Sequence, residues 1–495
     1  MLIVVAMLLV FIYRMTVLNP GSMGTIFIII PGLVALIFLF YNPKVCIVLL
    51  TLWIPFRNLL VGGVGKRFEG YDAFAILPEP VKYLDTYLLG ILTIIWISRN
   101  FFYREPYIKT PMDLPILIFI SLASVSAIGN LVNPIVAITG VRTFLQFALF
   151  YYAVVQLKLE EGFLKKIVIL YIGLAMIQTP VSVYNYLSVS SQTESMELLG
   201  DSTIGTFKGG TNLLAHYQGM MMIIVLGLIK FNPKKMFIYI LIFISFMISF
   251  FTASGRAAIY LFPLAAIFVL NLELKKIGDF VRSNFQLFFI FTCIISFLTI
   301  SGIMYKYYGE NLEKLSPSLL YENFMLEDEM YNGMYSGRNT SYRFAWNDLM
   351  KESFSPFLGV GSGMWLSNTG KFFEVPLYLK YNLSGSDADY YYGLESALAT
   401  DLPVLLTEFG FFGVIAFGFI FLKIFKNFKE GVSLFDDPFW KGISAGSVGV
   451  LIMITLASIA ERTLESIFIQ YLLWFFTGVI YQMRLIKEEV TKVGK

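Results

Sequence analysis

Arginine residues at the edges of apolar runs are the side chains in this sequence best suited to chemistry. The stretch TASGRAAIYLFPLAAIFVL, Thr252–Leu270, carries Arg256 in a run otherwise apolar enough for a lipid bilayer. A second arginine, Arg142 in TGVRTFLQF, lies near the start of another apolar run. Arg338 and Arg343 lie in a polar segment. An unpaired arginine in hydrocarbon costs at least ~2.5 kcal/mol. An arginine at the edge of an apolar run can snorkel to the surface or cap a helix while paired with a nearby acid, or it can bind an anionic ligand. A guanidinium fork suits phosphate oxygens.

Three carboxylic acids could accept a proton at such a site. Asp401 heads the run DLPVLLTEFG, where it could deprotonate a hydroxyl or cap a helix that has Pro403 in its first turn. Glu408 lies two turns further on and could serve the site or bind an arginine structurally. Glu395 is the third candidate. His216, the one histidine of the sequence, is expected to be a packed or capping residue.

The composition indicates a membrane protein. Of the 495 residues, 57% are hydrophobic and only 14% are charged, against about 25% charged residues in a soluble domain. The two cysteines, Cys46 and Cys293, both lie inside apolar runs. With a single histidine as well, the sequence predicts no metal site built from histidine and cysteine, and no disulfide framework.

The elements that must position these residues are apolar helices. A helix that crosses the hydrocarbon layer needs about 20 mostly apolar residues, and about fourteen such runs predict an all-α, polytopic membrane helix bundle. They lie at residues 2–18, 24–41, 45–61, 84–98, 114–132, 136–157, 166–187, 213–229, 236–253, 257–272, 285–305, 402–423, 440–458 and 466–483.

One long connection divides the chain into three parts. Residues 1–305 form an N-terminal transmembrane bundle, 306–401 a large loop, and 402–495 the C-terminal transmembrane helices with a short tail. The loop has seven Lys/Arg and thirteen Asp/Glu, which argues against a site for nucleic acid or anionic lipid. Its aromatic residues could stack on sugar faces or anchor a self-packed lid at the membrane interface. The segment Gly359–Trp365, GVGSGMW, is expected to be a tight turn, because it lacks the Lys-Ser/Thr ending of a nucleotide phosphate loop.

Lysine and arginine residues in the short connections predict the orientation. Clusters at residues 99–109, 158–166, 230–235, 275–282 and 423–441 all alternate onto one face of the bundle. Such residues stay on the cytoplasmic side. Both termini are then cytoplasmic, and the arginines and acids described above lie at the outer face together with the large loop.

Four segments resemble the O-antigen polymerase and ligase superfamily, in that family's order. TASGRAAIYLF resembles its serine-arginine-small motif, and GTFKGGTNLLAHY its Gly-Thr-Phe segment that opens a span. SYRFAWNDLMKESFSPFLGVGSGMW resembles its arginine-aromatic stretch followed by Pro-x-x-Gly-x-Gly. LLTEFGFFGVIAFGFIF resembles its Glu-x-Gly-x-x-Gly entry into a late span. The resemblance covers roughly residues 200–425.

This resemblance implies a GT-C-like glycosyltransferase of the inner (plasma) membrane that uses sugars linked to undecaprenyl diphosphate. It implies a site that faces the periplasm and works without metal or other cofactor. The family's arginines bind the donor diphosphate, a role that falls on Arg256, on Arg343 or Arg338, and less directly on Arg142. The expected partners are lipid-linked sugars, membrane lipid and a chain-length regulator protein, with no nucleic acid.

One departure separates the two branches of the family. Family ligases carry a His-Asn pair at a fixed distance before the Glu-x-Gly-x-x-Gly segment, and here that position holds Ala399 and Thr400. The polymerase branch is therefore favoured, with a glycan ligase as the alternative. A flippase for lipid-linked oligosaccharides is the rival class, although the paired short or broken helices typical of transporters are not evident in the sequence.

Overall fold

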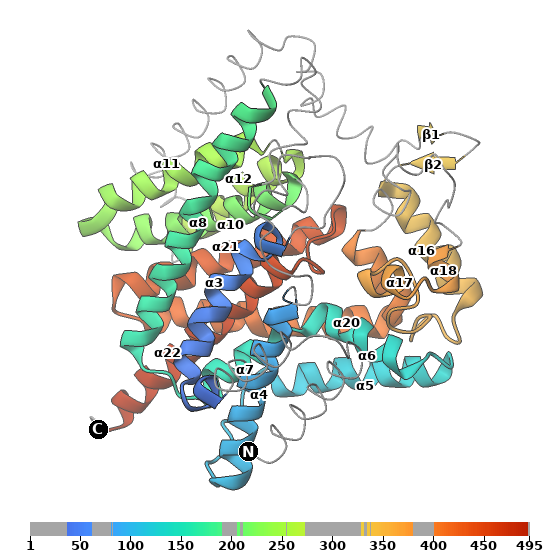
Figure 1. Ribbon diagram of the computed structural model, residues 1–495, viewed down its shortest axis with the longest axis horizontal. Helices are drawn as coiled ribbons and strands as arrows, with labels where there is room; N and C mark the ends of the chain where they lie inside the picture. The colour runs from blue at the N-terminus through green and yellow to red at the C-terminus, as the bar shows by residue number, and fades with distance from the viewer. Residues whose placement is uncertain are drawn as a thin grey trace, which may run out of the picture.

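The chain is described by a computed structural model, which covers residues 37–61, 81, 83–190, 205–207, 211–253, 255–272, 328–330, 334–336, 338–379 and 400–493 (Figure 1). Within these ranges the structure is helical apart from one small antiparallel hairpin, β1 (Asp328–Met330) paired with β2 (Met334–Ser336). The predicted helical membrane protein is therefore confirmed at this coarse level. The expected spans at 2–18 and 285–305, and most of 24–41, lie outside the described residues.

Helices occupy the other eleven predicted spans. Their bounds are α3 (Pro43–Val61), α4 (Leu84–Phe102), α5 (Asp113–Gly129), α6 (Pro134–Leu145), α7 (Ala148–Gln156), α8 (Glu161–Ser190), α10 (Thr211–Phe231), α11 (Met236–Thr252), α12 (Arg256–Asn271), α20 (Asp401–Leu434), α21 (Pro438–Ala460) and α22 (Ile467–Val493).

Six of the described helices are long and apolar enough to cross a membrane, namely α3, α8, α10, α11, α20 and α21, where the crossing segment assigned to α11 starts at Pro233. The bent pair α6 and α7 supplies a seventh if it counts as one span, and α5 and the apolar part of α12 are shorter apolar helices. A total of fourteen spans stays a prediction. Figure 1 shows α8 running across the layer of α10, α11 and α21 at a steep angle.

Helices α10 and α21 pack closely at the centre of the bundle because glycines line their contact. A Cβ atom at Gly446 would lie 2.5 Å from the Cα of Ile224, and one at Gly227 would lie 2.2 Å from the carbonyl oxygen of Gly442. Small residues at four-residue spacing let two helix backbones approach closely in a membrane, where dispersion and packing rather than water hold helices together. This pair forms the core on which the other helices pack.

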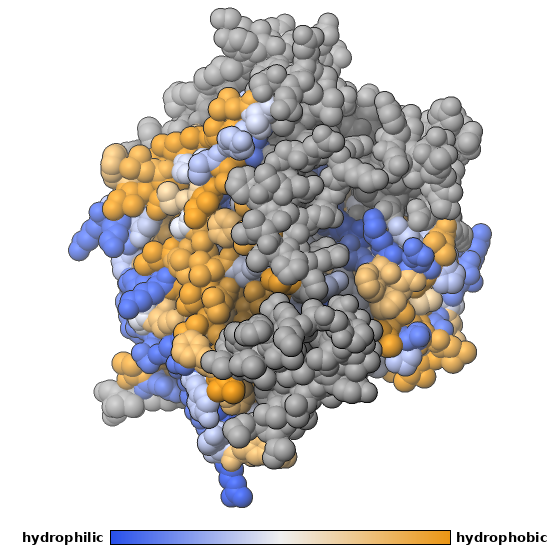
Figure 2. All heavy atoms as spheres, in the orientation of Figure 1, coloured by the Kyte–Doolittle hydropathy of each residue, from blue (hydrophilic) through white to orange (hydrophobic). Residues whose placement is uncertain are grey.

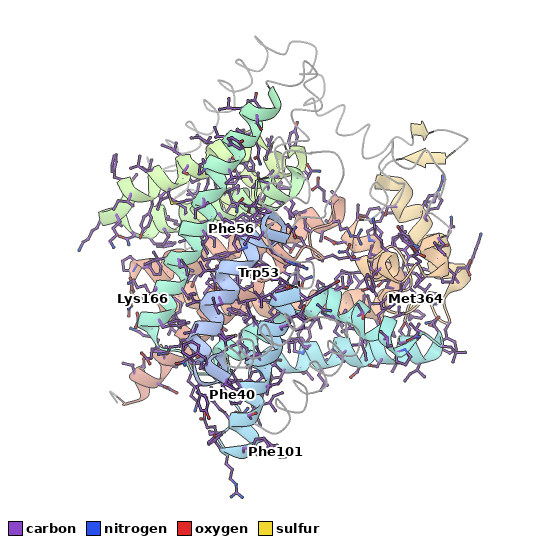
Figure 3. The ribbon with its side chains drawn as sticks, in the orientation of Figure 1. Phe40, Trp53, Phe56, Phe101, Lys166 and Met364 are labelled. Atoms are coloured by element: carbon purple, nitrogen blue, oxygen red, sulfur yellow. The ribbon has the colours of Figure 1, made fainter. Side chains whose placement is uncertain are left out.

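Lysine side chains characterise one of the two ends of the bundle. At one end, Lys165 pairs with Asp437 at 3.2 Å and Lys487 with Asp436 at 2.7 Å, and the ammonium of Lys441 lies 5.3 Å from the ring centroid of Phe231. The Lys487 ammonium holds the pKa of Asp436 below its ordinary value. We call this the Lys441 end. Figure 3 places Lys166 on this side and Met364 on the opposite one, and Figure 2 shows hydrophilic surface at the same margin.

The opposite end, which we call the Asp401 end, holds the described part of the large loop. Three helices lie there: α16 (Arg338–Glu352), α17 (Asn368–Phe372) and α18 (Pro376–Leu379). The start of α20 and the end of α21 meet at this end, where the Asp401 N–H donates to the carbonyl of Glu461. The expected basic connections at residues 158–166 and 423–441 thus meet at one end and the described part of the loop lies at the other, while the expected cluster at 275–282 lies outside the described residues.

Two predicted spans differ from the expected single straight helix. The run 136–157 bends by 65° between α6 and α7, although no glycine or proline marks the bend. The side chain of Gln146 lies at the bend and donates to Asp85 of α4, so the cause is a tertiary contact. The run 402–423 continues as α20 to Leu434 and is interrupted at Gly410, where φ is 67° and ψ is −173°.

Candidate functional site

A segment of the large loop completes the interrupted helix α20. In an unbroken helix, the N–H groups of Phe411 and Phe412 would pair with the carbonyls of Thr407 and Glu408. The segment Ser355–Trp365, which we call the glycine strap, supplies a partner for each of these four groups. They are Phe411 N–H to Pro356 at 3.3 Å, Phe412 N–H to Phe357 at 3.0 Å, Thr407 carbonyl to Val360 at 2.8 Å and Glu408 carbonyl to Gly361 at 3.1 Å.

Glycine is required where the strap meets the helix. Gly359, Gly361 and Gly363 all have positive φ, at 79°, 104° and 78°, which favours glycine because it lacks a Cβ. A Cβ at Gly410 would lie 2.4 Å from the carbonyl carbon of Phe357. The expected tight turn is present, because the Met364 N–H donates to the carbonyl of Gly361 at 3.2 Å. The same glycines also let the irregular backbone of this segment lie directly against α20.

The Glu408 carboxylate lies inside the strap. Its two oxygens accept hydrogen bonds from the N–H groups of Gly363 at 2.7 Å and Trp365 at 3.1 Å, and the side chain is fully buried. A carboxylate held by N–H donors satisfies the rule that buried charge must be paired or hydrogen-bonded. The position agrees with the structural alternative for Glu408, although its partners are backbone amides and not an arginine.

Asp401 holds the turn between α21 and α22. Its Oδ2 accepts from the backbone N–H of Thr463 at 2.6 Å, the Thr463 hydroxyl at 2.9 Å and the Leu464 N–H at 2.7 Å. Thr400, and not Asp401, occupies the N-cap position of α20. The expected cap is therefore wrong: Asp401 is the first helical residue, and its side chain turns toward a neighbouring loop.

A polar cluster beside this turn ties the loop to the bundle. Arg462 donates to the carbonyl of Leu366 at 2.9 Å and to Glu465 at 2.8 Å, and Glu465 accepts the N–H of Asn368 at 2.7 Å. The Trp365 indole N–H donates to Asp348 of α16 at 2.8 Å. These contacts fix the strap and α16 against the start of α22.

Helix α6 covers the other side of the strap and carries Arg142. A Cβ at Gly140 would lie 2.4 Å from the N atom of Gly363, and the Ser362 hydroxyl donates to the carbonyl of Ala137 at 2.9 Å. Asn133 caps the start of α6 by accepting the N–H of Ile135 at 2.9 Å. The strap therefore lies between α6 and α20.

Arg142 belongs to a polar group that includes two charged residues not singled out in the sequence. Its Nη2 donates to the Thr86 hydroxyl at 2.6 Å. Next to it, Arg57 of α3 and Asp85 of α4 form a buried ion pair with Nε and Oδ1 3.8 Å apart, and Gln146 donates to Asp85 at 3.0 Å. Arg57, Asp85 and Arg142 thus bring three charged side chains together at the Asp401 end of these helices.

His216 and Glu461 form a second buried pair. The His216 Nε2 lies 2.6 Å from Glu461 Oε2, and both side chains are less than one-tenth exposed. His216 is therefore packed, as expected, and Glu461 has a partner other than its neighbour in sequence. The pair joins the start of α10 to the end of α21, close to the start of α12, where a Cβ at Gly255 would lie 2.3 Å from that of Ala215.

Those expected site residues whose backbone the structure describes reach the same end through different elements. Arg256 and Arg338 are the first residues of α12 and α16, with side chains outside the described part, and Glu395 lies wholly outside the described residues. Arg343 is exposed on α16, one residue after Tyr342, whose hydroxyl donates to the carbonyl of Ile459. Burial, reinforced by the charge of Asp401, raises the pKa of Tyr342 to about 12, so this donor stays protonated.

Among the described residues, no group of three or more histidine, cysteine, aspartate and glutamate side chains is arranged to hold a metal ion. In the described part of the Asp401 end, Arg142 donates to Thr86 and Arg462 to Glu465, and the carboxylates of Asp401 and Glu408 are engaged in holding the fold. No protein-family model and no curated protein matches the chain. Its function must therefore be inferred from the sequence segments and from where the fold places them.

Proposed function

We propose that the chain is a glycosyltransferase that polymerises oligosaccharide repeat units linked to undecaprenyl diphosphate. The observation that carries the proposal is convergence. The four family-like segments are spread over roughly residues 200–425, yet their described parts meet at the Asp401 end.

Contacts between the four segments support this proposal. The start of α12 lies against the start of α10, and α10 reaches α21 through the His216–Glu461 pair. Helix α16 begins beside α20, where Ser341 and Thr400 have hydroxyl oxygens 3.4 Å apart. The strap then joins the third segment to the fourth along α20. A shared binding site would explain why glycine-rich segments of four elements are collected at one end.

The arginines supply the chemistry in this proposal. The bond between the anomeric carbon and the diphosphate oxygen breaks, a sugar hydroxyl forms the new bond from the opposite face, and undecaprenyl diphosphate leaves. Guanidinium groups placed at the departing diphosphate stabilise its growing charge, and losing one such donor typically costs ~2.7–4 kcal/mol. We assign this role to Arg256, with Arg343, Arg338 and Arg142 as further contacts.

The acids have a smaller part in the proposed reaction. The hydroxyl must lose its proton, and Asp401, Glu408 and Glu395 are the acids expected for that step. The first two are occupied by N–H donors in the fold. Because diphosphate is a good leaving group, a weak proton acceptor is sufficient. We assign structural roles to Asp401 and Glu408, and the proton of the attacking hydroxyl passes to Glu395.

The proposed location is the inner (plasma) membrane, with the Asp401 end facing the periplasm. The support is the basic character of the Lys441 end, since lysine and arginine in short connections remain cytoplasmic. Lipid-linked repeats presented at the outer face would then reach the arginines directly.

Deleting the gene and separating the cell's glycans on a gel tests the proposal. Loss of the ladder with a single repeat still attached supports a polymerase. Unattached lipid-linked polymer would instead identify a ligase, and lipid-linked single repeats trapped in the cytoplasm would identify a flippase.

Variants of Arg256 then test the site in the restored strain. A bidentate contact tolerates lysine poorly, because an ammonium keeps the charge but loses the fork. We expect Arg256→Lys and Arg256→Ala to reduce the ladder to single repeats at unchanged protein level, and Lys235→Ala at the Lys441 end to have no effect. A normal ladder in Arg256→Lys would show that charge alone suffices and would remove Arg256 as a diphosphate clamp.

A further inference from the structure

Large apolar side chains are exposed along the part of the loop that precedes and begins the strap. Trp346 is 49% exposed, Phe354 69% and Phe357 54%. Such side chains are rarely gathered on a surface that faces only water. Their position is fixed by the surrounding fold, because the Phe357 carbonyl accepts the Phe412 N–H of α20 and the Phe354 N–H donates to the side chain of Asn130.

These side chains continue the apolar surfaces of two membrane helices. The Phe357 ring stacks on Phe412 of α20, with centroids 5.1 Å apart, and the Trp346 ring lies 6.1 Å from Phe411. Further along α20, Ile415 is 68% exposed. An exposed apolar row on a membrane-crossing helix faces lipid, and the aromatic side chains of the loop extend this row.

The second junction is with the end of α5. The Phe354 N–H donates to the side chain of Asn130 at 2.7 Å, and a Cβ at Gly129 would lie 2.9 Å from the Phe354 ring. Next to this contact, Ile128 and Leu131 are exposed apolar residues. Figure 2 shows apolar surface over this region, at the lower right of the view. Phe354 thus adjoins the end of α5 and Phe357 adjoins α20, so the exposed aromatic side chains of the loop lie next to apolar surface on both helices.

Polar residues border this face on α16. Arg343, Asn347 and Lys351 are exposed on the same helix as Trp346 and Met350. A helix with an apolar side and a basic or polar side is suited to the boundary between acyl chains and headgroups, where tryptophan is also enriched.

We infer that the segment 346–357 lies in the interfacial layer of the bilayer, with Trp346, Phe354 and Phe357 in contact with acyl chains. The occupant of this apolar face is lipid, because the face adjoins the lipid-facing sides of α5 and α20. The large loop is then seated on the membrane along this segment. This inference does not depend on the proposed glycosyl transfer.

Spin labelling in liposomes tests the inference. Single cysteines would be placed at Phe354 and Phe357 in a chain lacking Cys46 and Cys293, with Ile415 as the lipid reference and Lys351 as the water reference. We expect nitroxides at positions 354 and 357 to collide more often with oxygen than with a water-soluble nickel chelate, as at 415, and the label at 351 to show the reverse preference.

Two results would overturn the inference. A preference for the nickel chelate at 354 and 357 would place the segment in water. Low collision rates with both reagents would show that protein covers the face, and broadening of the spectra between labelled copies would identify that cover as a second copy. Since all four positions are exposed in the fold, labelling is expected to leave the protein folded, and the reference labels check this in each preparation.

Discussion

At the scale of single residues, Gly410 decides whether the strap can lie against α20. Alanine there would be strained by the positive φ, at ~1–3 kcal/mol, and its Cβ would also collide with backbone of Phe357. We expect Gly410→Ala to lower the thermal unfolding midpoint in detergent. Gly418, on the same helix, is the matched control, because a Cβ added there would meet nothing within 4 Å, and Gly418→Ala should leave the midpoint unchanged or raise it. Equal midpoints for the two variants would contradict the assigned role of Gly410.

Asp401 offers a second residue-scale prediction. Its carboxylate accepts three hydrogen bonds from the turn at Thr463–Leu464, and hydrogen bonds to a charged group contribute ~1.5–3 kcal/mol each. We expect Asp401→Asn to lower the unfolding midpoint, with glycan elongation falling only in proportion to the remaining folded protein. Complete loss of elongation at unchanged stability would instead identify Asp401 as the proton acceptor.

The sequence allowed several residue-scale predictions, and its limits have physical causes. Arg142 and His216 could be picked out because a charged or lone polar residue beside an apolar run is unusual. Arg57 and Asp85 were missed, although opposite charges near the same end of successive apolar runs are a usable signal. The partners of Asp401 and Glu408 are mostly backbone amides of distant segments, and no residue type in the sequence marks such a contact.

At the scale of elements, the contact between α10 and α21 depends on close approach of two backbones. A methyl group at Gly446 would lie 2.5 Å from the Cα of Ile224, and overpacking of this kind typically costs ~1–3 kcal/mol. We expect Gly446→Ala to lower the unfolding midpoint and the yield of monodisperse protein. Gly90→Ala on α4 is the control, since a Cβ there meets nothing within 4 Å. A stable, well-behaved Gly446→Ala protein would show that the helices separate easily.

Hydropathy predicted the described helices well because the length and apolarity of each run of residues can be read from the sequence of that run alone. It could not predict the bend at Gln146 or the interruption at Gly410, because each depends on a partner far away in sequence. Asp85 accepts a hydrogen bond from the side-chain amide of Gln146, and the strap forms hydrogen bonds with the backbone groups of α20 that have no partner within the helix. The close contact between α10 and α21 could not be predicted from the sequence either, since glycines are common in membrane helices whether or not they mark a contact.

At the scale of the whole molecule, the basic Lys441 end predicts how the chain lies across the membrane. We expect a single cysteine at Lys351 to react with a membrane-impermeant thiol reagent in cells whose outer membrane is permeabilised. One at Lys235 should react only after the inner membrane is opened. Both side chains are exposed in the fold, so burial does not explain a difference. The opposite labelling pattern would place the Asp401 end in the cytoplasm and contradict the proposed access to lipid-linked sugars.

The strap also has a consequence for how the chain is made. Synthesis runs from the N-terminus, so Ser355–Trp365 leaves the ribosome before α20 does. The strap is therefore available at the Asp401 end before α20 is made. It can supply partners as soon as Thr407–Phe412 arrives, whose unpaired backbone groups would be poorly tolerated in lipid. The order of the two segments along the chain thus becomes an order in time, and exchanging them would bring the interrupted helix into the bilayer before anything could complete it.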